Sequence, residues 1–427
     1  MSDVVAKRIF MASAAFMLAC GAFLGGLIVE RYQIWPYAIV HEAFRVITEV
    51  AQFGESIPTG RRVAAPPNAS REVFTVRDPA RVTPGYYVFV LWDDAEHLYS
   101  AWLYDEQGSR RHVWRFHYDE LDPDGPWNGE DHPHPFYLLP DASVLVAFDS
   151  GDIMTRLDSC SEPMWIKHGI YHHALSQADD GTFWIWRGDG TPYGHYHYME
   201  NFDPETGETL REIGLIEDIL AKSGEASFVF AVRPDFPFER FDRDPEFRVA
   251  NDIFHPNDLD VLSENFAPQF PMFDTGDLLL SFRTFNLVAV IDPDTATVKW
   301  WQHGPWIGQH DPDFTADGKI SIYNNNSGRG RSEILKIDPL TRSIENELFY
   351  GDAQFYTEFM GKQQYLPDGN ILITVPGEGR VIEVTSDGKT VMEFNNIVAD
   401  FNEYNDHVQN AMWVPADYFE SPPACAD

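Results

Sequence analysis

The chain has 427 residues, of which 44% are hydrophobic and 14% aromatic, so it can bury a large core, and disorder of the whole chain is excluded. Acidic residues outnumber basic ones 67 to 31, and the net charge of −36 opposes binding to nucleic acid, which is therefore not expected as a partner. A site for an anion on this chain must be locally positive.

Residues 9–29 are a stretch of 21 residues without a charge, long enough to cross the hydrocarbon layer of a membrane as a helix. Lys7 and Arg8 precede the stretch, and the positive-inside rule then places everything after Glu30 on the export side. A cleaved signal peptide is the alternative, because the apolar stretch follows a basic region. We predict an uncleaved transmembrane anchor over residues 1–30.

Residues 31–71 are expected to connect this anchor to a folded domain. The apolar side chains of 31–54 have mixed helical spacing, which predicts an amphipathic helix that lies on the bilayer or packs on a partner protein. Residues 56–71 contain several prolines and a glycine, as expected of a linker. The remaining residues, 72–427, are predicted to form one domain.

The domain shows a repeat of short apolar runs broken by turn residues, which is typical of an all-β fold. Acidic hairpin turns recur at 105–108, 203–207, 292–295, 338–341 and 385–388, and a second set recurs at 139–141, 179–181, 316–318 and 366–369. Two hairpins make one four-stranded blade, which predicts blades near 85–116, 134–166, 173–212, 255–302, 310–348 and 362–395. We expect a six-bladed β-propeller that residues 410–419 close; a pair of β-sandwiches is the alternative.

Residues 213–251 do not fit the repeat. Their second half is rich in proline, phenylalanine and arginine, which favours an inserted loop that acts as a lid or contacts a partner.

Only three cysteines are present, and Cys20 lies in the predicted anchor. Cys160 and Cys425 could form one disulfide that ties the C-terminal tail to the domain, or they could be two unpaired buried thiols.

Four histidines occupy the same position in four repeats. His134, His173 and His310 each stand seven residues before a turn aspartate, and His255 opens its blade in the same way. Because the inner strands of a propeller begin near its axis, we expect the four imidazoles to converge on one funnel. A single histidine is usually structural, but four in one register favour a functional site.

Other polar and aromatic residues are expected near this funnel. Arg283 ends a predicted buried strand beside Asn286, where its guanidinium either pairs with an acid or binds an anion. Trp306 belongs to an aromatic segment that leads into His310, and it could stack on a flat substrate or pack in the core. We predict that Asn257, Asn286, His134 and Trp306 contact the substrate.

Several other chemistries lack their motifs. The chain has no GxxxxGK[ST], HExxH or GxSxG pattern, so nucleotide hydrolysis, zincin proteolysis and α/β-hydrolase chemistry are not indicated. Clustered histidines could hold a metal, but Arg283 disfavours a cation unless carboxylates such as Asp258 or Asp311 offset it. No cofactor and no metal are predicted.

The chain resembles the bacterial arylsulfotransferases between about residues 165 and 372. The segments that carry the resemblance are 171–173 (YHH), 255–258 (HPND), 281–283 (SFR) and 309–314 (QHDPDF). Members of this family are six-bladed propellers on the export side of the membrane. They transfer a sulfuryl group from an aryl sulfate to a phenol through a sulfated histidine, without a nucleotide donor.

The resemblance implies roles for four residues: His310 resembles the nucleophile, and His173, His255 and Arg283 resemble the groups that bind the sulfate. With the predicted anchor, it implies a single-pass protein of the bacterial inner membrane whose C-terminal domain is periplasmic. The alternatives are a non-catalytic propeller that docks on a membrane complex, through 31–54 or 213–251, and an oxidoreductase with a metal or quinone cofactor.

Overall fold

The computed structural model describes residues 16–17, 62–123, 125, 132–148, 153–188, 197–220, 254–346, 353–398, 401 and 403–425. The chain divides into two compact units, 1–62 and 63–427. The predicted anchor, apart from residues 16–17, and the predicted juxtamembrane helix lie outside the described residues, as does most of the predicted insert. No helix within the described ranges is both long enough and apolar enough to cross a membrane.

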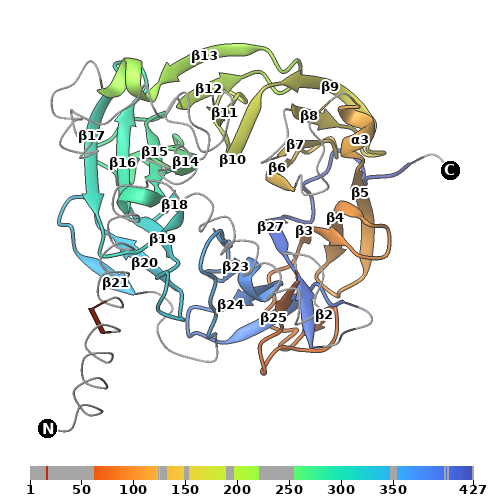
Figure 1. The fold of residues 1–427 in the computed structure, drawn as a ribbon. Helices are drawn as coiled ribbons and strands as arrows, with labels where there is room; N and C mark the ends of the chain where they lie inside the picture. The colour runs from red at the N-terminus through yellow and green to blue at the C-terminus, as the bar shows by residue number, and fades with distance from the viewer. Residues whose placement is uncertain are drawn as a thin grey trace, which may run out of the picture. The chain divides into compact units, whose positions relative to one another are not determined.

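The described residues of the second unit form six antiparallel sheets around a central axis, the blades of a propeller (Figure 1). The first three blades, from the inner strand outward, are as follows. Blade 1 consists of β27 (Val408–Val414), β3 (Tyr86–Asp93), β4 (Leu98–Asp105) and β5 (Arg110–Phe116). Blade 2 consists of β6 (Pro133–Leu138), β7 (Val144–Phe148), β8 (Ile153–Leu157) and β9 (Pro163–His168). Blade 3 consists of β10 (Ile170–Gln177), β11 (Phe183–Gly188), β12 (His197–Phe202) and β13 (Thr209–Gly214).

The other three blades follow the same order. Blade 4 consists of β14 (Pro256–Val261), β15 (Leu278–Phe282), β16 (Leu287–Asp292) and β17 (Thr297–His303). Blade 5 consists of β18 (His310–Phe314), β19 (Ile320–Asn324), β20 (Glu333–Ile337) and β21 (Ile344–Asn346). Blade 6 consists of β22 (Lys362–Tyr365), β23 (Ile371–Val375), β24 (Arg380–Val384), β25 (Thr390–Asn395) and the outer strand β2 (Phe74–Val76). The expected all-β, six-bladed propeller is therefore confirmed.

Short elements lie outside the blades. A two-stranded sheet consists of β1 (Arg62–Ala64) and β26 (Tyr404–Asp406). The helical turns are α3 (Tyr118–Leu121), the π-helical η1 (Leu215–Leu220), and the 3-10 turns η2 (Ala267–Gln269), η3 (Arg283–Phe285) and η4 (Pro376–Glu378). Because β13 reaches Gly214 and η1 follows, the predicted insert does not begin at residue 213.

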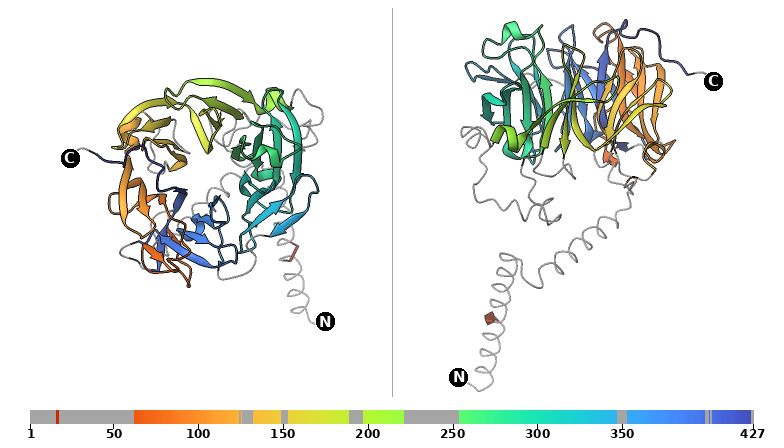
Figure 2. Two further views of the ribbon diagram at one scale, coloured as in Figure 1. Left: turned by 180° about the vertical axis from the view of Figure 1, so that it is seen from behind. Right: turned by 90° about the horizontal axis from the view of Figure 1, so that it is seen from above.

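The core consists of apolar clusters between neighbouring blades. Figure 2 shows the blades side by side around the ring. Side chains of a strand alternate between its two faces, so the middle strands are apolar on both. In β15, Leu280 packs toward blade 3 while Leu279 packs toward blade 5. Every residue of β15 is buried, which explains why this strand reads as a continuous apolar run in the sequence.

The two ends of the domain close the ring from opposite directions. The C-terminal strand β27 pairs with β3 as the inner strand of blade 1, with Met412 opposite Val88. The early strand β2 pairs with β25 as the outer strand of blade 6, with Thr75 opposite Glu393. The pairing of β27 confirms that residues near 410 close the ring.

Candidate functional site

Each inner strand has a basic side chain directly before it or within its first four residues. These residues are His407 directly before β27, His134 in β6, His173 in β10, His255 directly before β14, His310 at the start of β18 and Lys362 at the start of β22. The inner strands surround the axis (Figure 1), so the six residues come from all six blades to one end of the ring of inner strands.

Two of these histidines, His173 and His255, lie where the pairing of the inner strand with the next strand is irregular. The register of β10 shifts between His172 and Leu175, and His173 in the bulge has a φ of 66°. His255 has a φ of 43°, and the register of β14 shifts directly after Pro256. A bulge changes the direction in which a side chain points and commonly occurs at functional sites.

The structure brings the four predicted histidines together. The ring centres of His134 and His173 are 5.1 Å apart, and those of His173 and His255 are 5.3 Å apart. His310 is close enough to His134 and His255 for their charges to lower its pKa. Imidazoles from four separate blades therefore lie in one cluster.

Hydrogen bonds fix the tautomer of His310. Its Nδ1–H donates to the carbonyl of Gly308 (3.0 Å) and to Oδ1 of Asn325 (2.7 Å), which are both acceptors. Its Nε2 accepts the backbone N–H of Met360 at 3.1 Å, so the lone pair is on Nε2. Burial, with the nearby charge of Arg283, lowers the pKa of His310 well below 6.5, and the imidazole is neutral at pH 7.

A second buried pair of imidazoles adjoins the cluster. Nδ1 of His172 and Nδ1 of His173 are 2.7 Å apart, so one nitrogen donates and the other accepts, and the two share one hydrogen. Burial, followed by the charge of His172, lowers the pKa of His173 well below 6.5. The imidazole of His173 is therefore neutral at pH 7 and adds no positive charge to the site.

The positive charge of the site comes from Arg283, the first residue of η3. Its backbone N–H donates to the carbonyl of His255 at 3.0 Å, which ties it to the histidine cluster. The guanidinium Nε is buried and has no hydrogen-bond partner among the described residues. No carboxylate among those residues forms an ion pair with Arg283. In so acidic a protein, an arginine without a carboxylate partner suits an anion.

Three residues predicted to contact substrate have different environments. Asn257 is 3% exposed; its Nδ2 donates to the carbonyl of Gln309, and its Oδ1 has no partner among the described residues. Asn286 is structural, because its Oδ1 accepts the N–H of Gly308 at 2.7 Å. Trp306 is 1% exposed and lies in the apolar core, where its indole N–H donates to the carbonyl of Asn286. The prediction that it stacks on the substrate is therefore wrong.

A partly buried lysine links three inner strands beside the histidines. Nζ of Lys362 lies 2.6 Å from Oδ1 of Asp311 and 3.1 Å from Oδ1 of Asp258. Asp311 follows His310 directly, and its other oxygen accepts the N–H of Gln363. We call these three residues the lysine brace; it ties β14, β18 and β22 together where His255 and His310 enter the site.

Sequence reasoning missed several contributors to the site. Lys362 and His407 occupy the inner-strand position of their blades, but neither stands seven residues before a turn aspartate. Comparing the starts of the predicted inner strands would have found Lys362. The contact of Met360 leaves no signal in the sequence, because it is made by the backbone.

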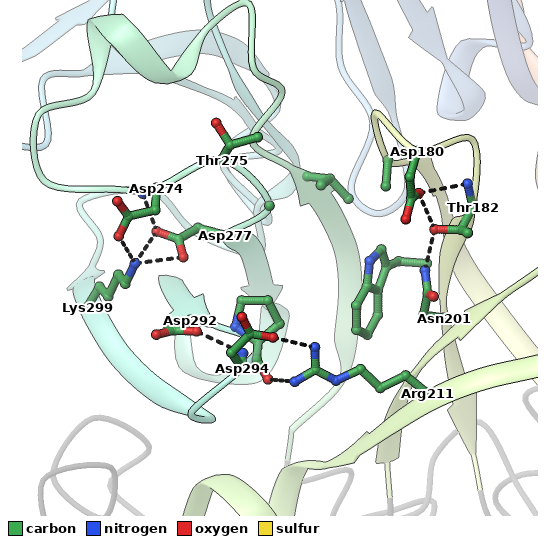
Figure 3. A pocket seen from close by; sticks show the side chains of 15 residues that line it. Asp180, Thr182, Asn201, Arg211, Asp274, Thr275, Asp277, Asp292, Asp294 and Lys299 are labelled. Carbon is green, nitrogen blue, oxygen red and sulfur yellow. Dashed lines mark hydrogen bonds and ion pairs between the residues drawn. The ribbon is translucent and has the colours of Figure 1, made fainter.

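A separate pocket of about 460 Å³ lies between blades 3 and 4 (Figure 3). It is lined by residues of turns at the far ends of the inner strands, such as Asp180 and Asp277, and it contains none of the histidines. Several of its acidic side chains already form ion pairs: Lys299 pairs with Asp274 and Asp277, and Arg211 pairs with Asp294. Within the described ranges, no group of three or more His, Cys, Asp or Glu side chains could hold a metal ion.

The comparisons with known proteins agree with this geometry. The family model described as arylsulfotransferase (ASST) matches residues 136–397, more than half of the chain, and spans His173, His255, Arg283 and His310. No curated protein matches the chain.

Solved structures resemble only the overall fold. A protein of unknown function from Bacteroides caccae is 8% identical, with a TM-score of 0.49 and 78% of this chain and 99% of that chain covered. TolB from Acinetobacter baumannii is 12% identical, with a TM-score of 0.46 and coverage of 78% and 67%. Virginiamycin B lyase from Staphylococcus aureus is 10% identical, with a TM-score of 0.39 and coverage of 75% and 88%. Nothing about activity follows from them.

Proposed function

The chain belongs to the arylsulfotransferase family, and from this premise we propose that it transfers a sulfuryl group from an aryl sulfate to a phenol through a sulfated His310. The observation that carries the proposal is the meeting of four imidazoles from different blades beside Arg283, which has no carboxylate partner among the described residues. A sulfate ester is an anion, and this is a locally positive site in an acidic protein.

His310 is suited to attack sulfur. Its pKa is lowered, so the ring is neutral at pH 7, and the Nδ1–H bonds to Gly308 and Asn325 leave the lone pair on Nε2. In the first step the Nε2–S bond forms, the bond from sulfur to the aryl oxygen breaks, and the aryl oxygen leaves as a phenolate, which takes a proton from water. In the second step an acceptor phenol loses its proton and attacks the sulfur, and Nε2 is released.

The surrounding groups stabilise the charge that develops on the sulfuryl oxygens. Arg283 supplies a full positive charge, and we assign a ring N–H of His173, whose imidazole is neutral, and a ring N–H of His255 as further donors. We assign Oδ1 of Asn257, a buried acceptor, to the hydroxyl of the incoming phenol. A neighbouring imidazole receives the proton of that phenol.

The test follows the adduct and the turnover together. The purified protein is mixed with 4-nitrophenyl sulfate, without an acceptor, and its intact mass is measured within seconds; 4-nitrophenol release is then followed with added phenol. We expect a sulfuryl adduct that maps to His310, and a loss of turnover of at least about 10³-fold in His310→Gln.

His97→Asn is the matched control, because His97 is exposed in the turn between β3 and β4 and its φ of 56° suits asparagine. It should react as the wild type does. Absence of phenol release in the wild type, or an adduct that persists in His310→Gln, contradicts the proposal.

A further inference from the structure

The C-terminal tail crosses from blade 1 onto blade 2. After β27, the ring of Phe419 packs on Tyr86 of blade 1, with ring centres 5.6 Å apart. The hydroxyl of Tyr418 then donates to the carbonyl of Leu138 in blade 2, and the N–H of Glu420 donates to the carbonyl of Pro140 at 2.9 Å. The tail therefore spans the boundary between these two blades.

The end of the tail lies against the turn between β8 and β9. Oγ of Ser159 donates to the carbonyl of Ala424 at 3.2 Å, and Sγ of Cys425 donates to the carbonyl of Ser159 at 3.2 Å. Sγ of Cys160 lies 3.8 Å from the same carbonyl of Ala424. These crossed contacts place Cys160 and Cys425 side by side, and both residues are exposed.

The two thiols also interact with each other. Desolvation, the hydrogen bond with the Cys160 thiol and the nearby charges of Cys160 and Asp158 raise the pKa of Cys425 to about 11. The thiol of Cys425 is protonated at neutral pH, so pairing should be faster at alkaline pH.

We propose that Cys160 and Cys425 form a disulfide that fastens the C-terminal tail to blade 2. A thiolate of one cysteine attacks a disulfide oxidant, such as oxidised glutathione, and releases one thiol. The second thiolate attacks the resulting mixed disulfide and releases the other thiol. The S–S bond forms, two thiol protons are lost, and the oxidant disulfide is reduced to two thiols.

The bond would hold the ring closed. The two cysteines are 265 positions apart, so the covalent loop contains every strand of blades 3 to 6 except β2, together with the closing strand β27. Cross-linking such distant positions restricts the unfolded chain, and the stabilising effect grows with the length of the loop. The link would also keep β27 from separating from β3, because the tail follows that strand directly.

Peptide mapping of the full chain tests the pairing. The protein is incubated at pH 8 with oxidised glutathione, free thiols are alkylated, and the chain is cleaved with trypsin without reduction. Cys160 then lies in the peptide 157–167, Cys425 in 390–427 and Cys20 in 9–31. We expect a linked species of 157–167 with 390–427, in the wild type and in Cys20→Ser alike, which reduction separates.

A thermal readout checks the proposed consequence. Reduction should lower the Tm of the oxidised wild type by roughly 5 °C, and it should not change the Tm of Cys160→Ser or Cys425→Ser. Three outcomes overturn the proposal. The peptides 157–167 and 390–427 could be recovered only as separate alkylated or glutathione-bearing peptides, or either could be linked to 9–31. The third outcome is a Tm of the oxidised wild type that reduction does not lower. The mapping uses no enzymatic assay, so its result is independent of the proposed sulfuryl transfer.

Discussion

The backbone N–H of Met360 donates a hydrogen bond of 3.1 Å to Nε2 of His310. Asn325 completes a closed circuit, because its Oδ1 accepts Nδ1–H of His310 and its Nδ2 donates to the carbonyl of Met360 at 2.7 Å. The circuit orients the imidazole from both sides. It also occupies the lone pair that would attack sulfur, so Met360 must withdraw its N–H before His310 can react.

Sulfation of His310 should expose the amide of Met360. A sulfuryl group on Nε2 removes the acceptor, so hydrogen exchange at this amide should be faster in the adduct than in the free protein. Exchange mass spectrometry of the protein treated with 4-nitrophenyl sulfate measures this. The amide of Leu280 in β15, and the same treatment of His310→Gln, are the controls and should not change. Equal protection of Met360 in free and sulfated protein would contradict the circuit.

The pH dependence of turnover should have an unusually low acid limit. His310 attacks only when neutral, and its pKa lies well below 6.5 because of burial and the charge of Arg283. As pH falls, kcat/KM should therefore persist through pH 6.5 and decline only below it. Aryl sulfates stay ionised over this range, so initial rates between pH 4 and 8 report on the protein. A midpoint at 6.5 or above would exclude His310 as the group that titrates.

Arg283 should matter for binding more than for folding. Arg283→Met removes the cation but breaks no ion pair within the described residues, so the Tm should stay within a few degrees of the wild type. The KM for 4-nitrophenyl sulfate should rise about 10–100-fold, as expected for loss of a charge-assisted hydrogen bond. Arg187→Met is the control: it loses contacts with Glu200 (3.3 Å) and Glu212, and should lower the Tm without changing KM.

The lysine brace should be needed for both stability and turnover. Lys362→Met leaves Asp258 and Asp311 buried without their cation, which should cost roughly 3 kcal/mol in urea unfolding. Because Asp311 follows His310, kcat should fall more than KM rises. Lys319→Met, which loses a pair with the exposed Glu345, should do neither. A second substitution, Asp258→Asn, should restore part of the stability; no recovery would argue against charge as the cause.

The blades were predictable because their turns are local. A tight turn needs particular residues at particular positions, so aspartate, proline and glycine mark each hairpin in the sequence. The predicted blade near 255–302 corresponds to strands from Pro256 to His303. The outer strand β2 was not predicted, because its three residues carry no pattern and pair with β25, more than 300 positions later.

The site was predictable only in part, for a related reason. The register of the histidines placed four of them at equivalent strand starts, and the structure brings them together. Trp306 was misjudged, because an aromatic residue near a site can face substrate or core, and its packing partners come from a neighbouring blade. His407 was missed because its strand closes the ring and has no following turn of the repeat.

The order of residues alone determined the repeat, the number of blades and the histidines at the start of four inner strands, because turns and strand alternation depend on neighbours in the chain. Only the tertiary structure decided which cation is available to an anion. Lys362 meets Asp258, 104 positions away, and Asp311, while Arg283 meets no carboxylate among the described residues. Such pairing depends on which blades are adjacent in space, and therefore on the closed ring.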